Sequence, residues 1–299
     1  MKHLLSIEQL NHDEIRQILE LTRTMKSKRG EPDHPTPLKG KSWGLIFTKA
    51  STRTRVSFEV AIRELGGWPL YLAGHEIQLG RGETVADTAR ALSRYLHGVI
   101  IRTFAQEDLE EFAACGSIPV INALTDDEHP CQILADLFTI EEKLGSLQGK
   151  HITFLGDGDC NVARSWIFAA AKMHMRLTIA APRGYQPRPA LLARAGGDIT
   201  VTEDIFAAAK DADILYTDVW VSMGKETEAV DRLRVLAPYQ LNAAVVARAK
   251  PNALVMHCLP AYRGKEISAE LLDARQKDIF DQAENRLHTQ KAILALLNR

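Results

Sequence analysis

The sequence lacks an excess of charge of either sign. Lysine and arginine number 37 against 38 aspartate and glutamate residues, so the formal net charge over 299 residues is -1. No global positive field is therefore available to hold a nucleic-acid backbone, and any anion has to be bound locally. We accordingly expect no nucleic-acid partner.

Cysteines, long apolar runs and leader signals are also scarce. The four cysteines form no CxxC pair, which argues against a zinc knuckle and against a disulfide framework. No apolar stretch approaches the ~20 residues needed to cross a bilayer, and the segment from Met1 to Glu14 has neither a long apolar run nor an arginine-rich, acid-poor composition. We expect reduced thiols, a cytoplasmic location and no membrane association.

What the sequence does contain is a regular alternation of short β-rich runs and amphipathic segments. A first series of expected strands covers 43–48, 68–73, 99–104 and 118–124, and a second covers 151–155, 177–181, 198–201, 214–217 and 253–257. Strands alternating with helices imply right-handed crossovers and parallel sheets. We predict an α/β protein of two doubly wound domains with parallel sheets.

The joint between the domains is expected near His129-Pro130-Cys131-Gln132. Pro130 suits the first position of a helix that runs to about Leu144. Apolar positions in the C-terminal segment indicate a last helix that packs back on the body. We predict a first domain over residues 1–132, completed by a C-terminal helix at about 284–299, and a second domain over 133–283.

Polar side chains follow the ends of the expected strands, where doubly wound folds bind their ligands. In the first half these are Ser51-Thr52-Arg53-Thr54-Arg55, Arg102, His129 and Gln132; in the second half they are Asn161, Asp218, Ser222-Met223-Gly224 and Cys258. If the two sheet edges face one another, they enclose an interdomain cleft. We expect the active site there.

The segment Ser51–Arg55 is the strongest local signal. A helical apolar face follows at Phe58, Ala61 and Ile62, so a helix begins close to Ser51. Its free N–H groups, the hydroxyl groups and the guanidinium of Arg53 together suit a phosphate dianion. The plainer alternative is an N-capping serine followed by solvated arginines.

The turn Gly156-Asp157-Gly158 invites a different class of function, an NAD-dependent oxidoreductase. The match to a dinucleotide-binding turn is poor, because Asn161 stands at the third glycine position and no acidic residue follows about 20 positions later. Single residues also allow plainer readings: His129 as a loop histidine and Cys258 as a small hydrophobe.

These segments together resemble the aspartate and ornithine carbamoyltransferase family over nearly the whole chain. Ser51–Arg55 is similar to the carbamoyl phosphate motif of the family, and His129–Gln132 is similar to the element that holds the carbamoyl end. The loop Ser222-Met223-Gly224 after Asp218, and the segment His257-Cys258-Leu259-Pro260, resemble the branch that uses ornithine. The aspartate branch has a proline in place of this cysteine.

The resemblance implies transfer of the carbamoyl group of carbamoyl phosphate to the δ-amine of L-ornithine, giving L-citrulline and phosphate, in arginine biosynthesis. Putrescine or a modified ornithine as the amine is the alternative, and the direction of the reaction in the cell stays open. The chemistry requires no metal and no cofactor, since arginines and a histidine can stabilise the negative charge that grows on the carbonyl and leaving oxygens.

Carried over residue by residue, the resemblance implies the following roles. Carbamoyl phosphate would be bound by Ser51, Thr52, Arg53, Thr54, Gln78, Arg102, His129, Gln132, Cys258, Leu259 and Arg286. Ornithine would be held by Asn161, Asp218, Ser222 and Met223, and the catalytic residues would be Arg53, Arg102, His129, Asp218, Cys258 and Arg286. Residues 1–132 would form the carbamoyl phosphate-binding domain and residues 133–283 the ornithine-binding domain.

Two further expectations follow from the resemblance. Gln78 is similar to a residue that reaches into the site of a neighbouring subunit, which implies a homotrimer or a multiple of trimers. Cys160 stands where the family often has the first of two adjacent asparagines, and Asn161 keeps the second. The contacts to the carboxylate of ornithine are therefore the part of the site in which this chain departs from the family.

Overall fold

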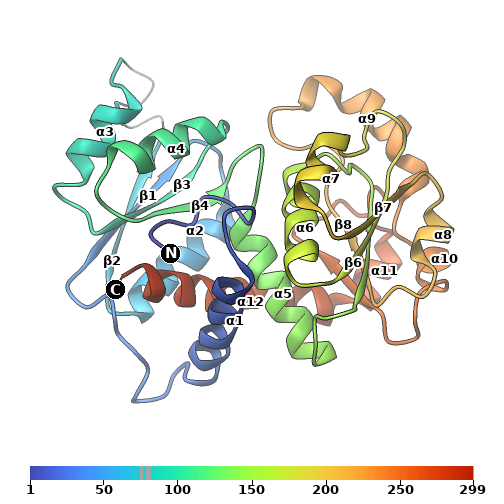
Figure 1. The fold of residues 1–299 in the computed structure, drawn as a ribbon, viewed down its shortest axis with the longest axis horizontal. Coiled ribbons are helices and arrows are strands. Elements are labelled where there is room, and N and C mark those ends of the chain that lie inside the picture. Colours follow the sequence, from blue (N-terminus) through green and yellow to red (C-terminus); the bar gives the residue numbers. More distant parts are fainter. Residues whose placement is uncertain (75–76, 79–81, 299) are drawn as a thin grey trace. The chain divides into compact units, whose positions relative to one another are not determined.

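The computed structural model describes residues 1–74, 77–78 and 82–298. The chain forms two compact units (Figure 1). The first unit comprises Met1–Phe138 and Asn285–Arg299, and the second comprises Thr139–Glu284. Two helices pass from one unit to the other along the chain: α5 (Pro130–Leu144) and α12 (Gln276–Leu297).

The first unit is built on a four-stranded parallel sheet in the order β2-β1-β3-β4. The strands are β1 (Ser42–Phe47), β2 (Trp68–Ala73), β3 (Gly98–Arg102) and β4 (Val120–Leu124). The helices are α1 (His12–Ser27), α2 (Thr52–Glu64), α3 (Val85–Leu92) and α4 (Gln106–Cys115). The crossover from β1 to β2 runs in one direction along the sheet, and those from β2 to β3 and from β3 to β4 run in the other. Right-handedness therefore sends α2 to one face of the sheet and α3 and α4 to the opposite face.

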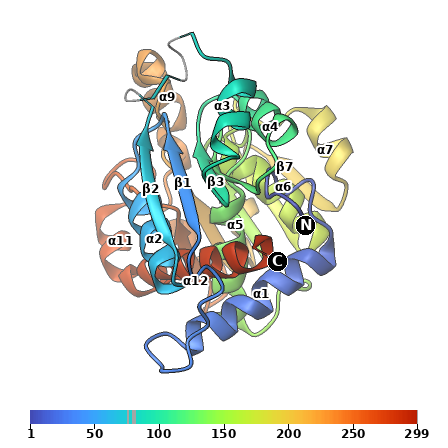
Figure 2. The same cartoon turned by 90° about the vertical axis from the view of Figure 1, so that its left-hand side faces the viewer.

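The core of the first unit follows the two-residue alternation of its strands. Ile46, Val99 and Ile101 share one face and pack with Leu109 and Phe112 of α4. Helices α3 and α4 lie together over this face, as Figures 1 and 2 both show. The C-terminal part of α12 belongs to the same unit, where the fully buried ammonium of Lys291 pairs with Glu64 of α2 at 2.6 Å.

The second unit is built on a five-stranded parallel sheet in the order β7-β6-β5-β8-β9. The strands are β5 (His151–Leu155), β6 (Arg176–Ala180), β7 (Asp198–Thr202), β8 (Ile214–Thr217) and β9 (Leu254–His257). The helices are α6 (Asn161–Lys172), α7 (Pro189–Ala195), α8 (Ile205–Ala209), α9 (Ala229–Leu236), α10 (Ala243–Val246) and α11 (Ala269–Ala274). Short 3-10 turns at Glu226–Glu228 and Ala237–Tyr239 flank α9.

Aromatic side chains fill one side of the second core. Tyr216 of β8 stacks on Phe154 of β5 and meets the edge of Trp166 of α6, with both pairs of ring centroids 5.6 Å apart. The other face carries Leu155, Leu215 and Val255 against the apolar residues of α8, α10 and α11. The predicted α/β class, with parallel sheets in two domains, is confirmed.

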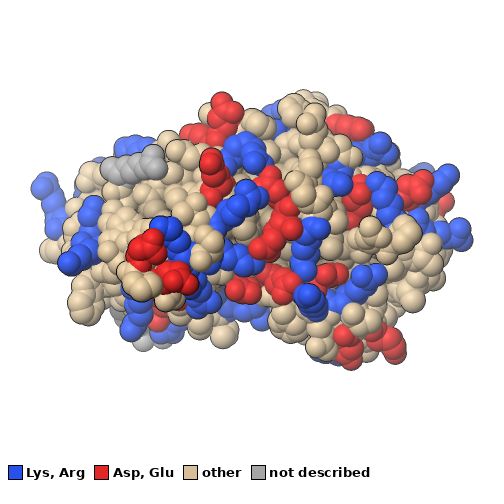
Figure 3. Space-filling view, turned by 90° about the horizontal axis from the view of Figure 1, so that it is seen from below, with Lys and Arg blue, Asp and Glu red and all other residues tan. Residues whose placement is uncertain are grey.

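Charged side chains of both signs are interspersed over the face that Figure 3 shows. Among residues 1–74, 77–78 and 82–298, no helix combines the length and the apolarity needed to cross a membrane. The predicted site residues lie at or after the carboxyl ends of the strands, except Arg286, which lies in α12.

Candidate functional site

The predicted phosphate cradle forms the first turn of α2. Ser51 is the N-cap, and its hydroxyl accepts a hydrogen bond from the N–H of Thr54 at 3.2 Å. The first turn carries no acidic residue, so the positive end of the helix dipole is not neutralised locally. Thr52 and Arg53 are exposed there, whereas Thr54 is buried. The capping alternative is therefore correct for Ser51, and it leaves the two neighbours available to a ligand.

The second arginine of this segment has a different place. Arg55 donates to the carboxylate of Glu59 one turn later at 2.8 Å, and its guanidinium lies 3.6 Å from the ring centroid of Tyr71. These contacts stabilise the packing of α2 beside β2. Arg53 is exposed in the first turn of the helix.

Three buried basic groups come together in the first unit. Arg286 of α12 donates from Nη2 to the hydroxyl of Thr54 at 2.5 Å. Arg102 at the end of β3 and His129 before α5 are both about 5% exposed. Burial lowers the pKa of His129 well below its ordinary value, and the positive charges of Arg286 and Arg102 lower it further. The imidazole is therefore neutral at working pH, and it can donate one hydrogen bond without adding charge.

Gln132 contributes an acceptor beside this group. Its amide nitrogen donates to Asp136 one turn later at 2.9 Å. The amide oxygen is buried and has no hydrogen-bond partner among the residues that the structure describes. A buried acceptor in this state is stabilised by a donor that a ligand would bring, such as the NH2 of a carbamoyl group.

Two other residues of the first unit, Cys131 and Gln78, differ in their relation to these basic groups. The pKa of Cys131 is raised by burial to about 12, and its thiol donates to the carbonyl of Asn122 at 3.3 Å, so this thiol has a structural role. Gln78 is exposed in a bend, and residues 79–81 of its segment lie outside the described residues. The structure does not bring Gln78 together with the basic groups.

Lys49 was not among the predicted residues. Its ammonium is buried, pairs with Asp126 and lies 4.2 Å from the ring centroid of Phe104. This pair ties the loop that leads into α2 to the loop after β4. The only signal in the sequence was a lysine two positions before Ser51, which is too common a feature to single out.

The second unit joins Asp218 and Cys258 directly. The thiol of Cys258 donates to Oδ1 of Asp218 at 2.9 Å, and the N–H of Val219 donates to the same oxygen at 2.7 Å. Burial raises the pKa of Asp218 above its ordinary value, although His257 and both hydrogen bonds act in the opposite direction. The carboxyl group therefore has a stronger tendency to take up a proton than a solvated aspartate has.

Asn161 and Cys160 stand at the start of α6. Asn161 is the first helical residue, and the thiol of the N-cap Cys160 accepts from the N–H of Ala163 at 3.5 Å. Burial raises the pKa of Cys160 well above the ordinary thiol value, and the carboxylates of Asp218 and Asp157 raise it further. Cys160 is accordingly a neutral thiol near Asp218 rather than a reactive thiolate.

The loop after Asp218 carries two further predicted residues, Ser222 and Met223, which are more exposed than Asp218. Ser222 is half-buried and Met223 is 43% exposed. The N–H of Gly224 instead donates to the carboxylate of Glu226 at 3.0 Å. Ser222 and Met223 thus follow Asp218 in the same loop and are more exposed than its carboxylate.

Arg232 of α9 is a second residue that sequence reasoning missed. Its buried guanidinium pairs with Asp157, donates from Nε to the carbonyl of Trp220 at 2.6 Å and lies 5.0 Å from the ring centroid of Tyr185. It therefore links the turn after β5 to the loop after β8. A buried aspartate in that turn requires a cationic partner, but the two residues are 75 positions apart in the sequence, and no local pattern connects them.

The glycines of the same turn have a packing explanation. A Cβ atom at Gly158 would lie 2.6 Å from the side chain of Ile179, and Gly156 has φ +119° beside the indole of Trp220. Both positions require glycine because neighbouring side chains approach closely. The approach of a dinucleotide is not needed to account for them.

One group in the second unit has the spacing of metal ligands. Atoms of Asp218, His257 and Cys258 lie within 4.8 Å of one another. Both ring nitrogens of His257 already have partners, the N–H of Leu259 at 2.9 Å and Glu266 at 3.1 Å. A metal ion bound through His257 would have to replace one of these hydrogen bonds, so the arrangement is explained as a hydrogen-bond cluster.

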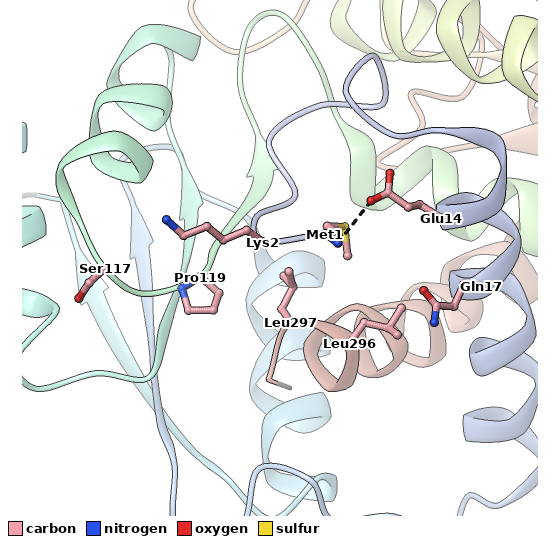
Figure 4. Close-up of a pocket in the computed structure, with 8 residues that line it drawn as sticks. All are labelled: Met1, Lys2, Glu14, Gln17, Ser117, Pro119, Leu296 and Leu297. Carbon is pink, nitrogen blue, oxygen red and sulfur yellow. Dashed lines mark ion pairs between the residues drawn. The ribbon is translucent and has the colours of Figure 1, made fainter.

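A cavity in the first unit lies elsewhere (Figure 4). Its volume is about 470 Å³, and it is lined by Met1, Lys2, Glu14, Gln17, Ser117, Pro119, Leu296 and Leu297. None of the predicted site residues is among them. The amino group of Met1 pairs there with Glu14 at 3.4 Å.

Comparisons with known proteins agree with the geometry of both units. The family model for the carbamoyl-P binding domain of aspartate/ornithine carbamoyltransferase matches residues 2–142, and the model for its Asp/Orn binding domain matches residues 148–297. An ornithine carbamoyltransferase of Syntrophus aciditrophicus is 53% identical over 300 residues, which cover 99% of each chain. That of Akkermansia muciniphila is 51% identical, over 99% of this chain and 98% of the relative.

A solved structure is also similar to this chain over almost its full length. The ornithine carbamoyltransferase from Pyrococcus furiosus superimposes with a TM-score of 0.93 at 44% identity, covering 99% of this chain and 96% of that one. The family models cover both units, and the identities extend over the full length of these relatives. The chain therefore belongs to the aspartate/ornithine carbamoyltransferase family.

Proposed function

We propose that the protein transfers the carbamoyl group of carbamoyl phosphate to the δ-amine of L-ornithine, giving L-citrulline and phosphate. The observation that carries the choice of ornithine is the buried carboxyl of Asp218, which accepts from the thiol of Cys258. A buried carboxylate suits a substrate with a second amino group, whereas aspartate brings a second carboxylate and would need a cation at this place. The names of the relatives support this choice.

The first unit binds carbamoyl phosphate in this proposal. The exposed start of α2, with Ser51, Thr52 and Arg53, receives the phosphate together with Arg102. An anion at a helix N-terminus is stabilised by the free N–H groups and the dipole. Arg53 adds a planar guanidinium, which can donate two parallel hydrogen bonds to phosphate oxygens.

The carbamoyl end is recognised by donors and one acceptor. Thr54, Arg102 and His129 polarise the carbonyl oxygen together with Arg53. Because His129 is buried and its pKa is lowered, it acts as a neutral donor. The amide oxygen of Gln132, which has no partner among the described residues, accepts from the carbamoyl NH2 together with the main-chain carbonyl of Leu259. Arg286 helps to fix this end of the substrate and donates to Thr54.

The transfer itself forms a C–N bond and breaks the bond between the carbonyl carbon and the bridging oxygen of phosphate. A free alkylammonium has a pKa of about 10.4, so the amine has to lose a proton before it attacks. The Asp218 carboxyl, with its raised pKa, is positioned to take that proton, and Cys258 orients the carboxyl. Negative charge on the carbonyl and leaving oxygens is stabilised by preorganised donors, which contribute several kcal/mol. Cys258 is not a covalent nucleophile, because direct transfer between two bound substrates requires no acyl-enzyme.

Ornithine is held by Asn161, Asp218, Ser222 and Met223 in this proposal. We further propose that residues 1–132 with 284–299 act as the carbamoyl phosphate-binding domain and 133–283 as the ornithine-binding domain. The two family models support a carbamoyl-P binding part at residues 2–142 and an Asp/Orn binding part at 148–297, and the grouping of Asn285–Arg299 with the first unit supports the assignment of the C-terminal helix. The two sets of residues then serve one reaction.

We also propose a cytoplasmic homotrimer, or a multiple of trimers, acting in arginine biosynthesis. The four free cysteines support a reducing compartment. The resemblance of the Gln78 segment to a residue shared between subunits supports the trimer. Sedimentation velocity would show a species of about 100 kDa for three chains of 33.2 kDa, and a monomer at working concentration would contradict it.

The test of the reaction measures citrulline and phosphate from carbamoyl phosphate and L-ornithine. We expect equal amounts of both products. The matched variants are Arg53→Ala and Arg63→Ala, which lie on the same helix. Full activity of the Arg53 variant would refute the cradle, and phosphate release without citrulline would refute the transfer.

A further inference from the structure

The turn after β9 contains a residue in the left-handed backbone conformation, and a buried histidine accepts a hydrogen bond from its N–H. Leu259 has φ +56°, in the left-handed region that non-glycine residues rarely occupy. Its N–H donates to Nδ1 of His257 at 2.9 Å, two residues earlier. The side chain of Leu259 also packs against the core cluster of the second unit. A left-handed leucine at a strand end persists when its surroundings fix it, and such positions concentrate at functional sites.

The hydrogen bond from Leu259 determines the protonation of the histidine ring. Because Nδ1 accepts an N–H, the ring proton lies on Nε2. That nitrogen is 3.1 Å from Oε1 of Glu266, and both side chains are buried. The same carboxylate oxygen accepts from the N–H of Tyr262 at 2.6 Å. Glu266 therefore holds the ring in one tautomer and one orientation.

The main chain of His257 is fixed from another direction. Its N–H donates to the amide oxygen of the buried Gln282 of α12 at 2.9 Å. The histidine is thus anchored through both backbone and ring. It stands directly before Cys258, whose thiol reaches Asp218, and two residues before the Leu259 carbonyl.

We propose that His257 is a positioning residue, whose Nδ1 holds Leu259 in its left-handed conformation and so aims the Leu259 carbonyl and the Cys258 thiol at the substrates. This inference rests on the proposed function, which gives those two groups their roles. His257 itself touches neither substrate. Its contribution is to keep the turn preorganised, because a displacement of a positioning group by about 1 Å can lower a rate by about a hundredfold.

If His257 had only a structural role, it would fill space and donate a hydrogen bond to Glu266, and its replacement would change only the stability of the protein. The two roles depend on different ring nitrogens. The amide oxygen of asparagine lies close to the position of Nδ1 and can still accept from Leu259. The longer glutamine side chain reaches toward the position of Nε2 and Glu266, and it leaves the N–H of Leu259 without that acceptor.

The experiment therefore compares His257→Asn with His257→Gln. The control is His151→Gln. His151 is a buried histidine on β5 of the same sheet, and its Nε2 lies 2.9 Å from the hydroxyl of Thr178. Three quantities are measured for each variant: the thermal midpoint, hydrogen–deuterium exchange of the peptide over 258–262, and kcat and KM for both substrates.

We expect His257→Gln to lower kcat by about tenfold to a hundredfold and to speed exchange over 258–262. We expect His257→Asn to stay within about threefold of the parent kcat, a loss smaller than one hydrogen bond usually produces. The control should lose stability without a change in kcat. Equal exchange and equal kcat in the two His257 variants would overturn the proposal, as would a rate loss in the control as large as that of His257→Gln.

The exchange measurement separates this inference from the proposed function. If the parent protein forms no citrulline, the proposed function fails, while the exchange contrast still decides whether His257 holds the turn. If the parent is active and the exchange contrast is missing, only the positioning role fails. A variant that does not fold is recognised by its thermal midpoint, and the remaining His257 variant then decides by its own exchange and kcat.

Discussion

The buried ion pair between Arg232 and Asp157 makes a strong prediction about stability. Replacing Arg232 by methionine keeps most of the apolar stem but removes the guanidinium. The Asp157 carboxylate, 7% exposed, then loses this cationic partner, and the Trp220 carbonyl loses its donor. Removing one partner of a buried pair costs about 3–5 kcal/mol, because the remaining charge is buried without compensation.

The size of this effect can be measured by urea unfolding. A slope of about 2 kcal/mol/M is typical of a unit of this size, so a loss of about 4 kcal/mol shifts the midpoint by roughly 2 M. Tryptophan fluorescence follows the transition, and two of the four tryptophans, Trp166 and Trp220, lie in the second unit. We also expect a higher KM for ornithine, since Arg232 joins the turn of Asp157 to the loop that follows Asp218.

The matched control is Arg234→Met, two residues away on α9. Arg234 pairs with Asp231 at 3.3 Å, and both side chains are more than 70% exposed. A surface pair of this kind contributes little, so the control should unfold close to the parent. Adding Asp157→Asn to Arg232→Met should recover a large part of the loss by removing the uncompensated charge. Equal midpoints for the two arginine variants would refute the reasoning.

Three further changes test the substrate half-sites. Arg53→Ala should raise the KM for carbamoyl phosphate by roughly 10- to 150-fold, since a charge-assisted hydrogen bond contributes about 1.5–3 kcal/mol. Arg63→Ala on the same helix should leave this KM unchanged, and steady-state kinetics compares the two variants. Cys258→Ala should raise the KM for ornithine more than the KM for carbamoyl phosphate, and an unchanged ornithine KM with an unchanged kcat would remove Cys258 from the site. Asp218→Asn should stop catalysis and yet raise the thermal midpoint at neutral pH. In the folded parent, burial raises the pKa of Asp218 above the ordinary 3.8. The parent therefore loses stability as pH rises from 3.8 through the folded pKa. If Asp218→Asn still raised the thermal midpoint below pH 3.8, burial of the charged carboxylate would not be the cause.

Much of the fold could be predicted because its signals are local. The parallel α/β class in two domains followed from strands and helices in alternation, and it is confirmed. The strand ends were less accurate. The run 118–124 begins as a strand only at Val120, directly after Pro119, and 99–104 ends at Arg102. Proline cannot donate to a strand ladder. At Arg102 the pairing of β3 with β4 shifts register, and beyond it Phe104 is 45% exposed.

The family and the reaction that the resemblance implied are confirmed by relatives of about 50% identity. The individual residue roles stay predictions. What the sequence could not reveal are partners far apart along the chain. Lys49 and Asp126 are 77 residues apart, and Arg232 and Asp157 are 75 apart. Such pairs form only when the sheets bring their loops together, and no local pattern encodes them.

The most direct test of the central claim compares four amines with carbamoyl phosphate: L-ornithine, putrescine, acetylornithine and aspartate. Each is assayed for its carbamoylated product and for phosphate. The Asp218–Cys258 pair and the loop of Ser222 and Met223 predict that kcat/KM is highest for L-ornithine and that aspartate is not carbamoylated. A preference for putrescine would show that the α-carboxylate is not recognised. Transfer to aspartate would contradict the account of the second unit.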